Sequence, residues 1–451
     1  MPDAADLGEL SAAAVAAARS GEDVEAYAEE SRRTSVRVRG GEVEEFVFAE
    51  SRGVGVRVIL DGRLGYAYAA DPDPAAVAEV VAAARENARF SEPDPGNVLP
   101  QLGSFEPLPE IFRQDQLGVS SDRKVELALE LERVATGTRP EVRKVESANY
   151  GDAVGRVAVA STWGGPLEYA RTDVWASVVC LAERDGETQT GYAFRLGRET
   201  EDLLWAEAAE EAAVRAARLL GAAKPRSERL PVVFDPYTAT SFLGVLAGAL
   251  SADAVQKGRS MFAPLVGQSV GSELVSLVDD GRLLDGASAA PFDDEGVPTM
   301  RTVLVEAGVL RGFLYDTRTA ARAGGDARST GNASRAGYRT VPGVSPSNLF
   351  FQAGSVTPEE LLRQAGRGVY VQEVSGLHSG ANPISGEFSV GAVGLRVEGG
   401  ALGEPLREMT IASTLLDVLK GIAAAGSDLR FVGGGLGAPT LLVGEMTIGG
   451  L

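Results

Sequence analysis

The sequence predicts an α+β protein of two lobes, each built around a mainly antiparallel sheet. Three observations predict it. Segments that alternate apolar and polar residues recur with glycine-containing turns between them, which is typical of strands joined as hairpins. A few longer segments carry apolar residues at helical spacing. A polar segment at 224–229 separates an N-terminal α+β domain, 1–225, from a glycine-rich, mainly β C-terminal domain with a few helices, 226–451.

The N-terminal domain opens with an alanine-rich helix at 4–18, which Gly21 ends. Two dipeptides, Gly40-Gly41 and Asp61-Gly62, are hairpin turn signals. Alternation around these turns predicts strands at 25–39, 43–50, 53–60 and 63–68. Asp73-Pro74 then opens a second helix that reaches residue 88.

A polar, proline-containing connection at 91–116 leads to the second half of this domain. Ser120 and Ser121 are candidate N-caps for a helix at 121–134. Alternation predicts four strands, at 142–148, 155–161, 166–183 and 188–195. The strongest helical periodicity of the chain lies at 200–219.

The C-terminal domain begins with an apolar strand at 230–234, followed by short alternating strands rich in glycine. Helices are expected at about 237–254, 358–364 and 415–424. The run Asp293-Asp294-Glu295 suggests a cation site, but consecutive residues on a strand point to opposite faces. A turn with solvated charges is therefore the favoured interpretation.

The chain has 451 residues and a formal net charge of −20. This charge disfavours binding to nucleic acids or to anionic membranes, because both require a basic surface. No window is long and apolar enough for a membrane span. Cys180 is the single cysteine, so no internal disulfide is expected, and residues 1–10 lack the pattern of a secretory signal. Together these features predict a cytoplasmic protein.

The one histidine, His378, limits the chemistry further. Catalytic zinc sites usually take several histidines, so a His-rich zinc site cannot come from this chain alone. A Ser-His-Asp triad would have to use His378, and no nucleophile-elbow motif accompanies it. The composition still allows a magnesium or manganese site made only of carboxylates.

Several C-terminal segments in order resemble the TldD/PmbA family, also called modulators of DNA gyrase. They are Asp235-Pro236 with the helical segment that follows it, then 290–297, 301–324, 329–333, 376–394 and 446–450. The N-terminal hairpins at 36–68 resemble the opening sheet of that family. The resemblance covers nearly the whole chain.

The resemblance also shows what this chain lacks. The TldD branch carries a zinc-binding H-E-x-x-x-H motif on the helix before a Lys-Gly pair. Counted back from Lys257-Gly258, those three places hold Leu243, Gly244 and Gly248, none of which can bind a metal or move a proton. The stretch at 431–437, which matches the region of a cysteine ligand in that branch, has no cysteine. This pattern is similar to the PmbA branch, also called TldE.

The resemblance implies a non-catalytic subunit of a TldD/TldE-type heterodimeric zinc metalloprotease that processes or degrades peptides and unfolded proteins. Zinc is expected in the TldD-type partner and no cofactor in this chain. An extended peptide is the expected substrate, recognised through main-chain hydrogen bonds. Candidate contacts with the substrate channel or the subunit interface are His378, Ser379, Asn382 and Glu387; hydrogen bonds to the backbone for His378 and a solvated charge for Glu387 are the alternatives.

Two other functions stay open at this point. The chain could act as a stand-alone homodimer that holds peptides without cutting them. It could also be an enzyme with chemistry that does not use zinc, based on carboxylates or a bound cofactor. Small residues around Gly244 and Gly248 would in either case allow another segment to approach this helix closely.

Overall fold

The computed structural model describes residues 6–450, so the first two residues of the helix predicted at 4–18 lie outside the described residues. The first lobe contains α1 (Leu7–Ala16), β1 (Asp23–Arg39), β2 (Glu42–Leu60), β3 (Arg63–Ala70), α2 (Pro74–Ala88), α3 (Ser121–Thr138), β4 (Val142–Ser161), β5 (Gly164–Arg184), β6 (Glu187–Gly197) and α4 (Trp205–Ala217). Short 3₁₀ turns at Pro109–Ile111 and Gln114–Gly118 interrupt the predicted connection.

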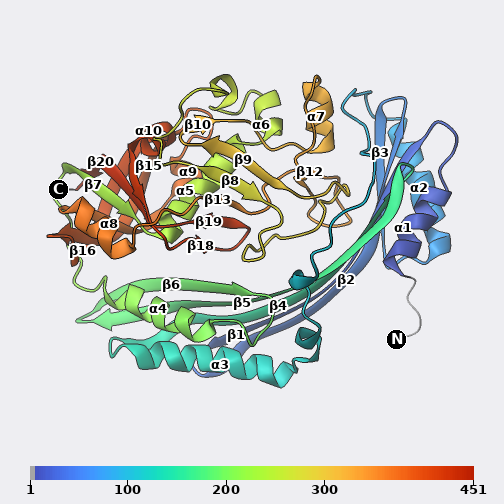
Figure 1. Cartoon of the computed structure of the whole chain (residues 1–451). Helices are drawn as coiled ribbons and strands as arrows, with labels where there is room; N and C mark the ends of the chain where they lie inside the picture. Colours follow the sequence, from blue (N-terminus) through green and yellow to red (C-terminus); the bar gives the residue numbers. More distant parts are fainter. Residues whose placement is uncertain (1–5, 451) are drawn as a thin grey trace.

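One long, curved sheet organises this lobe (Figure 1). Its strand order is β3-β2-β1-β4-β5-β6, and every neighbouring pair is antiparallel. The four helices cover its convex face, with α1 and α2 at one end and α3 and α4 at the other. The side chains of β5 alternate between buried and half-buried along much of its length, as expected for a strand with one face under helices.

Two strands are longer than the sequence predicts. Residues 142–148 and 155–161 belong to one strand, β4, and residues 43–50 and 53–60 to one strand, β2. Glycines inside these two strands make room for aromatic rings. A Cβ on Gly151 would lie 2.1 Å from the ring of Trp175, and a Cβ on Gly53 would lie 2.4 Å from the ring of Tyr338. Glycine inside a strand often marks such a close approach.

The second lobe lies in the hollow of the curved sheet (Figure 1). Its strands are β7 (Glu228–Phe234), β8 (Leu277–Asp280), β9 (Arg301–Glu306), β10 (Val309–Leu310), β11 (Ala333–Ser334), β12 (Gly343–Val344), β13 (Leu349–Phe351), β14 (Gly368–Ser375), β15 (Glu387–Glu398), β16 (Ala401–Thr414), β17 (Ile422–Ala425), β18 (Arg430–Phe431), β19 (Leu436–Ala438) and β20 (Leu441–Gly449). Its helices are α5 (Pro236–Ala249), α6 (Ala252–Gln256), α7 (Thr317–Ala323), α8 (Pro358–Ala365), α9 (Leu377–Gly380) and α10 (Leu415–Gly421), with a 3₁₀ turn at Ala263–Leu265.

Two six-stranded sheets carry this lobe, in the orders β16-β15-β14-β7-β20-β17 and β10-β9-β8-β13-β19-β18. In the first sheet β16 also pairs with β20, which closes the sheet on itself. Helix α5 belongs to the large hydrophobic core of this lobe, which includes residues of both sheets. The predicted α+β class with two lobes is confirmed, and the boundary between residues 225 and 226 stays a prediction.

The structure shortens two predicted helices. The helix predicted at 237–254 is two helices, because the Ser251 hydroxyl accepts a hydrogen bond from Ala254 N at 3.2 Å and so caps α6 separately. The helix predicted at 200–219 begins only at Trp205. Thr200 lies outside α4 and is bound to Gln116, whose Oε1 accepts from the backbone N and the hydroxyl of Thr200, each at 2.9 Å.

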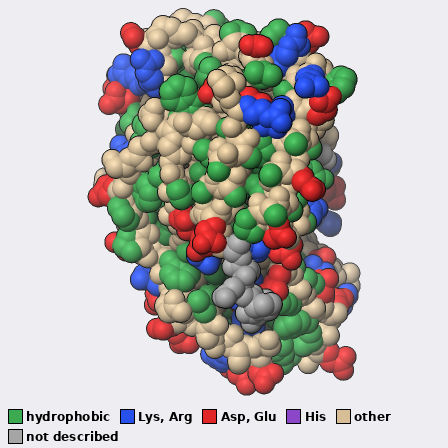
Figure 2. All heavy atoms as spheres, turned by 90° about the vertical axis from the view of Figure 1, so that its right-hand side faces the viewer, with side chains coloured by type: hydrophobic (Ala, Val, Ile, Leu, Met, Phe, Trp, Pro, Cys, Tyr) green, Lys and Arg blue, Asp and Glu red, His purple; other side chains and the backbone are tan. Residues whose placement is uncertain are grey.

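The surface gives further limits. Among the helices between residues 6 and 450, none combines the length and apolar character needed to cross a membrane. Acidic and basic side chains are interspersed with apolar ones on the face drawn in Figure 2, and neither sign of charge gathers there into one large patch.

Candidate functional site

Helix α5 carries the three positions at which the resemblance would place a zinc motif. Asp235 caps its start, because the carboxylate accepts a hydrogen bond from Tyr237 N at 2.8 Å. Leu243 is fully buried in the core of the second lobe. Gly244 and Gly248 lie on the exposed side of the helix.

A zinc ion does not fit these positions. Leu243 offers only aliphatic carbon, and the two glycines offer no side chain at all, whereas zinc is bound by thiolate, imidazole or carboxylate. Across residues 6–450, outside the side chain of His378, no group of three or more His, Cys, Asp and Glu side chains is placed to hold a metal ion. No step that depends on a metal is therefore assigned to this chain.

A cavity of about 460 Å³ lies beside α5, between the two lobes. Elements of both lobes line it: β6 and α4 from the first, and α5, β14 and the turn before β19 from the second. The lining side chains include Tyr192, Arg215, Tyr237, Thr240, Val374 and Leu436, together with the backbone at Gly244. This mixture of aromatic, aliphatic and hydrogen-bonding groups is typical of a binding pocket.

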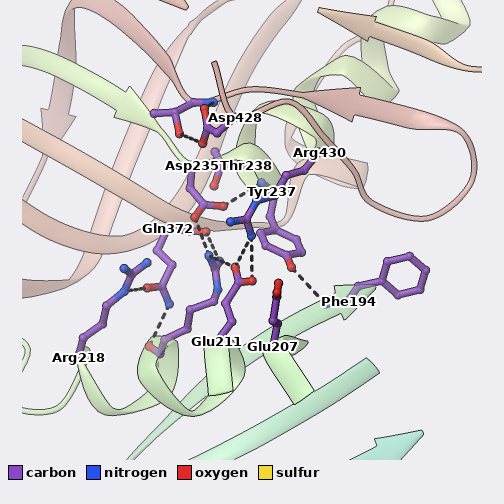
Figure 3. Close-up of polar contacts among 12 residues, drawn as sticks. Phe194, Glu207, Glu211, Arg218, Asp235, Tyr237, Thr238, Gln372, Asp428 and Arg430 are labelled. Atoms are coloured by element: carbon purple, nitrogen blue, oxygen red, sulfur yellow. Dashed lines mark hydrogen bonds and ion pairs between the residues drawn. The ribbon is translucent and has the colours of Figure 1, made fainter. Parts of the chain in front are cut away.

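An ion pair between the lobes, Arg215 with Asp235, lies beside the cavity, which Arg215 lines. Figure 3 shows the polar contacts around Asp235. Arg215 on α4 donates to the Asp235 carboxylate at 2.5 Å and to the carbonyl oxygen of Gln372 at 3.1 Å. The Tyr370 hydroxyl donates to the same carboxylate at 2.7 Å. Arg215 and Asp235 are only 6% and 2% exposed, so this contact is shielded from solvent and fixes the first lobe against the second.

Two tyrosines provide the aromatic part of the cavity. The guanidinium of Arg215 lies over the ring of Tyr237, 4.5 Å from its centroid, and the Tyr237 hydroxyl accepts from Phe194 N at 3.1 Å. Tyr192 meets Tyr237 edge to face with ring centroids 5.8 Å apart. Burial raises the pKa of Tyr237 and raises that of Tyr192 to about 12, so both phenols stay protonated at neutral pH.

A second ionic cluster joins the same elements (Figure 3). Glu211 on α4 pairs with Arg195 of β6 and with Arg430 of β18, each at 2.8 Å. Arg218, the C-cap residue of α4, donates to the side-chain oxygen of Gln372, and Gln372 donates back to the carbonyl of Arg215 at 3.2 Å. These contacts hold α4, β6, β14 and β18 in fixed positions around the cavity.

Two polar atoms at the cavity have no partner. The Thr240 hydroxyl is buried without a hydrogen bond, on a residue that is 6% exposed, and Nε of Arg215 is buried without one as well. Leaving a buried polar group unpaired costs about 1–3 kcal/mol. A ligand with hydrogen-bonding groups in this cavity could satisfy such atoms. The lining holds no cysteine or histidine, but it includes the hydroxyl residues Thr238, Thr240 and Ser241 and the carboxylate of Glu373.

The loop residues predicted as contacts lie elsewhere in the second lobe. Asn382 accepts hydrogen bonds from Ile384 N at 2.9 Å and from Ser385 N at 3.2 Å, and Glu387 accepts from the Ser385 hydroxyl at 3.2 Å. Ser379 is exposed on the short helix α9. The side chain of His378 lies outside the described residues. Ser379, Asn382 and Glu387 do not line the cavity beside α5.

The acidic run at 293–295 is a turn, but its charges are not solvated as predicted. Asp293 is 7% exposed and Glu295 fully buried. Glu295 pairs with Arg57 of the first lobe at 2.9 Å, and Arg57 donates to Glu25 at 3.0 Å. Burial raises the pKa of Asp294 to about 6. The prediction of solvated charges was wrong because the cation that pairs with Glu295, Arg57, comes from a strand more than 200 residues away in the sequence.

Cys180 has no part in either ionic cluster. The thiol is fully buried on β5, and burial raises its pKa to about 12. A thiol with so high a pKa carries almost no thiolate at neutral pH, and thiolate is the reactive and metal-binding form. Cys180 is therefore a packing residue.

Sequence reasoning missed the residues that build the cavity. Arg215 lies among the charged residues of α4, whose sequence carries no functional motif. Gln372 and Arg430 lie in the short strands β14 and β18, which carry none either. The one available signal was Asp235-Pro236, which marks the start of α5 and also supplies the carboxylate that binds Arg215.

Comparison with known proteins agrees with this architecture. Three family models match: the PmbA/TldA metallopeptidase domain 1 over residues 24–88, the central domain over 115–220 and the C-terminal domain over 227–450. An uncharacterized protein of Methanocaldococcus jannaschii is 30% identical over 378 residues, covering 82% of this chain and 84% of that protein. The metalloprotease PmbA of Escherichia coli O157:H7 is 29% identical over 419 residues, covering 92% and 90%.

Solved structures show the same fold. A proposed modulator of a DNA gyrase from Thermotoga maritima superposes with a TM-score of 0.87 at 29% identity, covering 95% of this chain and 96% of that one. TldE from Thermococcus kodakarensis superposes with a TM-score of 0.88 at 22% identity, covering 95% and 97%. With all three domain models matched in order and relatives aligned over most of their length, the chain belongs to the PmbA/TldD family of metallopeptidases.

Proposed function

We propose that this chain is the non-catalytic, peptide-binding subunit of a hetero-oligomeric zinc metallopeptidase whose partner chain holds the zinc. The observation that carries the proposal is the composition of α5. Leu243 packs into the core, and Gly244 and Gly248 carry no side chain, so none of the three motif positions supplies a ligand or a general base.

The cavity beside α5 supports a binding role. Tyr192, Tyr237 and Leu436 offer an apolar wall for a side chain, and the unpaired Thr240 hydroxyl offers a hydrogen bond. The ion pair of Arg215 with Asp235 holds both lobes in position, so little ordering would be required when a ligand binds. An extended peptide has both kinds of group, apolar side chains and main-chain amides.

Two further parts of the proposal rest on sequence. The single buried cysteine fits a cytoplasmic location for the complex. The loop with His378, Ser379, Asn382 and Glu387 is proposed to contact the substrate or the partner, outside the α5 cavity.

The test compares the chain alone, the zinc-binding H-E-x-x-x-H subunit of the same organism alone, and both together. Zinc is measured by plasma mass spectrometry, and cleavage is followed with a fluorogenic peptide library. The expected result is no stoichiometric zinc and no cleavage for this chain, zinc in the other subunit, and full activity only for the mixture. Stoichiometric zinc and cleavage by this chain alone would overturn the proposal.

A further inference from the structure

The long strand β2 has an outer edge that is only partly covered. Strand β3 pairs with β2 from Gly53 onward, and the last bond on that side runs from Asp71 N to the Arg52 carbonyl at 3.0 Å. Figure 1 shows β3 only at the upturned end of the sheet. Within residues 6–450, no strand pairs with residues 42–51 on the side away from β1; this stretch is called the free edge of β2 below.

The direction of the free backbone groups follows from the pairing. The Arg52 carbonyl points away from β1, and the backbone groups of a strand alternate between its two neighbours. The N–H and C=O groups of Phe46, Phe48 and Glu50 therefore also point outward. They form a row of donors and acceptors that can bind another strand.

Large apolar side chains flank this row. Val43, Phe46, Val47 and Phe48 are 41%, 42%, 39% and 59% exposed. Consecutive apolar residues on an open edge promote strand pairing, and proteins usually cover or interrupt them. The free edge therefore combines unpaired backbone groups with apolar area on both faces.

The free edge is also held in shape. The amides of Gly40 and Gly41 at the hairpin turn both donate to Glu132 on α3 at 2.7 Å. Arg32 on β1 pairs with Glu50 at 3.0 Å. A strand fixed in this way loses little conformational freedom when a partner binds, which favours association.

The charges decide which partner fits. Glu42, Glu44, Glu45 and Glu50 lie along the free edge, and the whole chain carries a net charge of −20. Glu44 and Glu50 pair with Arg39 and Arg32 of β1 at 3.9 and 3.0 Å but stay exposed, so their carboxylates can still meet a partner strand. A second copy would bring the same glutamates into the opposite strand, where like charges are destabilising. A strand with Lys or Arg opposite these glutamates gains cross-strand attraction.

We propose that the free edge of β2 pairs with an edge strand of a different protein chain, which places basic side chains opposite the glutamates and apolar side chains opposite Phe46, Val47 and Phe48. The inference rests on the proposed function, because a hetero-oligomer supplies such a chain. The curved sheet then continues from one subunit into the next.

The test uses the full chain and the zinc-binding H-E-x-x-x-H subunit of the same organism as the probe, with affinity measured by calorimetry. Phe48→Pro removes one outward N–H and leaves the bonds to β1 in place, because proline is tolerated on edge strands. Glu44→Lys/Glu45→Lys reverses the charge. Glu79→Lys on α2 is the matched control, an exposed glutamate at the other end of the lobe.

Both edge variants are expected to weaken binding by about tenfold or more, and the control by less than about twofold. Hydrogen exchange is expected to show protection of the Phe46 and Phe48 amides in the wild-type complex, and melting curves check the fold of each variant. Wild-type affinity in both edge variants, without protection of these amides, overturns this inference alone. A wild-type chain that does not bind the probe overturns the proposed function as well. Self-association that the edge variants abolish assigns the edge to a second copy and also overturns the inference.

Discussion

The ion pair between Arg215 and Asp235 is predicted to contribute strongly to the stability of the contact between the lobes. Arg215→Met keeps the aliphatic length and removes the guanidinium. The Asp235 carboxylate then stays buried with only the Tyr370 hydroxyl and the Tyr237 amide as partners. Removing one partner of a buried ion pair lowers the free energy of unfolding by about 3–5 kcal/mol. Because Asp235 keeps two hydrogen bonds, we expect a loss of about 3 kcal/mol for Arg215→Met.

The assay is urea denaturation followed by tryptophan fluorescence and by circular dichroism. Arg367→Met is the control, because Arg367 pairs with Glu228 at 2.6 Å but is 62% exposed, and such pairs contribute less than about 1 kcal/mol. The double variant Arg215→Met/Asp235→Asn removes both charges and is expected to regain about 2 kcal/mol relative to Arg215→Met. If Arg215→Met lowers the free energy of unfolding no more than Arg367→Met does, the Arg215–Asp235 pair does not stabilise the contact between the lobes as proposed.

Three further predictions test the cavity and the buried acids. Gly244→Ala is expected to stabilise the chain by about 0.5–1 kcal/mol in thermal denaturation, because alanine favours a helix and the added Cβ meets Leu436 at an ordinary 3.6 Å; a loss of stability would show a tighter site. Thr240→Val removes an unpaired buried hydroxyl, so stability should rise by about 1 kcal/mol while peptide affinity, measured by fluorescence anisotropy, falls; unchanged affinity would remove Thr240 from the binding site. Asp294 has a folded pKa of about 6, above its unfolded value, so its ionisation costs stability as the pH rises from about 4 to 7. The new side chain of Asp294→Asn can still accept from the Arg335 amide. In urea titrations the free energy of unfolding of this variant should therefore be about 1 kcal/mol above that of the wild type at pH 7.5 and equal to it at pH 4. Equal stability of the two proteins at both pH values would contradict the raised pKa.

Local signals predicted the kind and order of most elements. Hairpin turns at Gly40-Gly41 and Asp61-Gly62, and the caps at Ser120 and Asp73, act within a few residues of the chain. Their energies depend on backbone geometry that the neighbouring residues already define. Element ends were less predictable. A local cap at Ser251 separates α6 from α5, and Thr200 is bound to Gln116 of a distant segment instead of lying in α4.

The sequence by itself determined what chemistry α5 cannot perform, because the absence of ligand atoms at Leu243, Gly244 and Gly248 is a property of the residues and not of their packing. Only the tertiary structure shows that Arg215 pairs with Asp235 and that Glu295 is buried against Arg57. These pairs join segments that are remote in the sequence, and the free energy of burial exists only once both lobes are in place. For the same reason the free edge of β2 is visible only when the whole sheet has formed and β3 is seen to end before covering it.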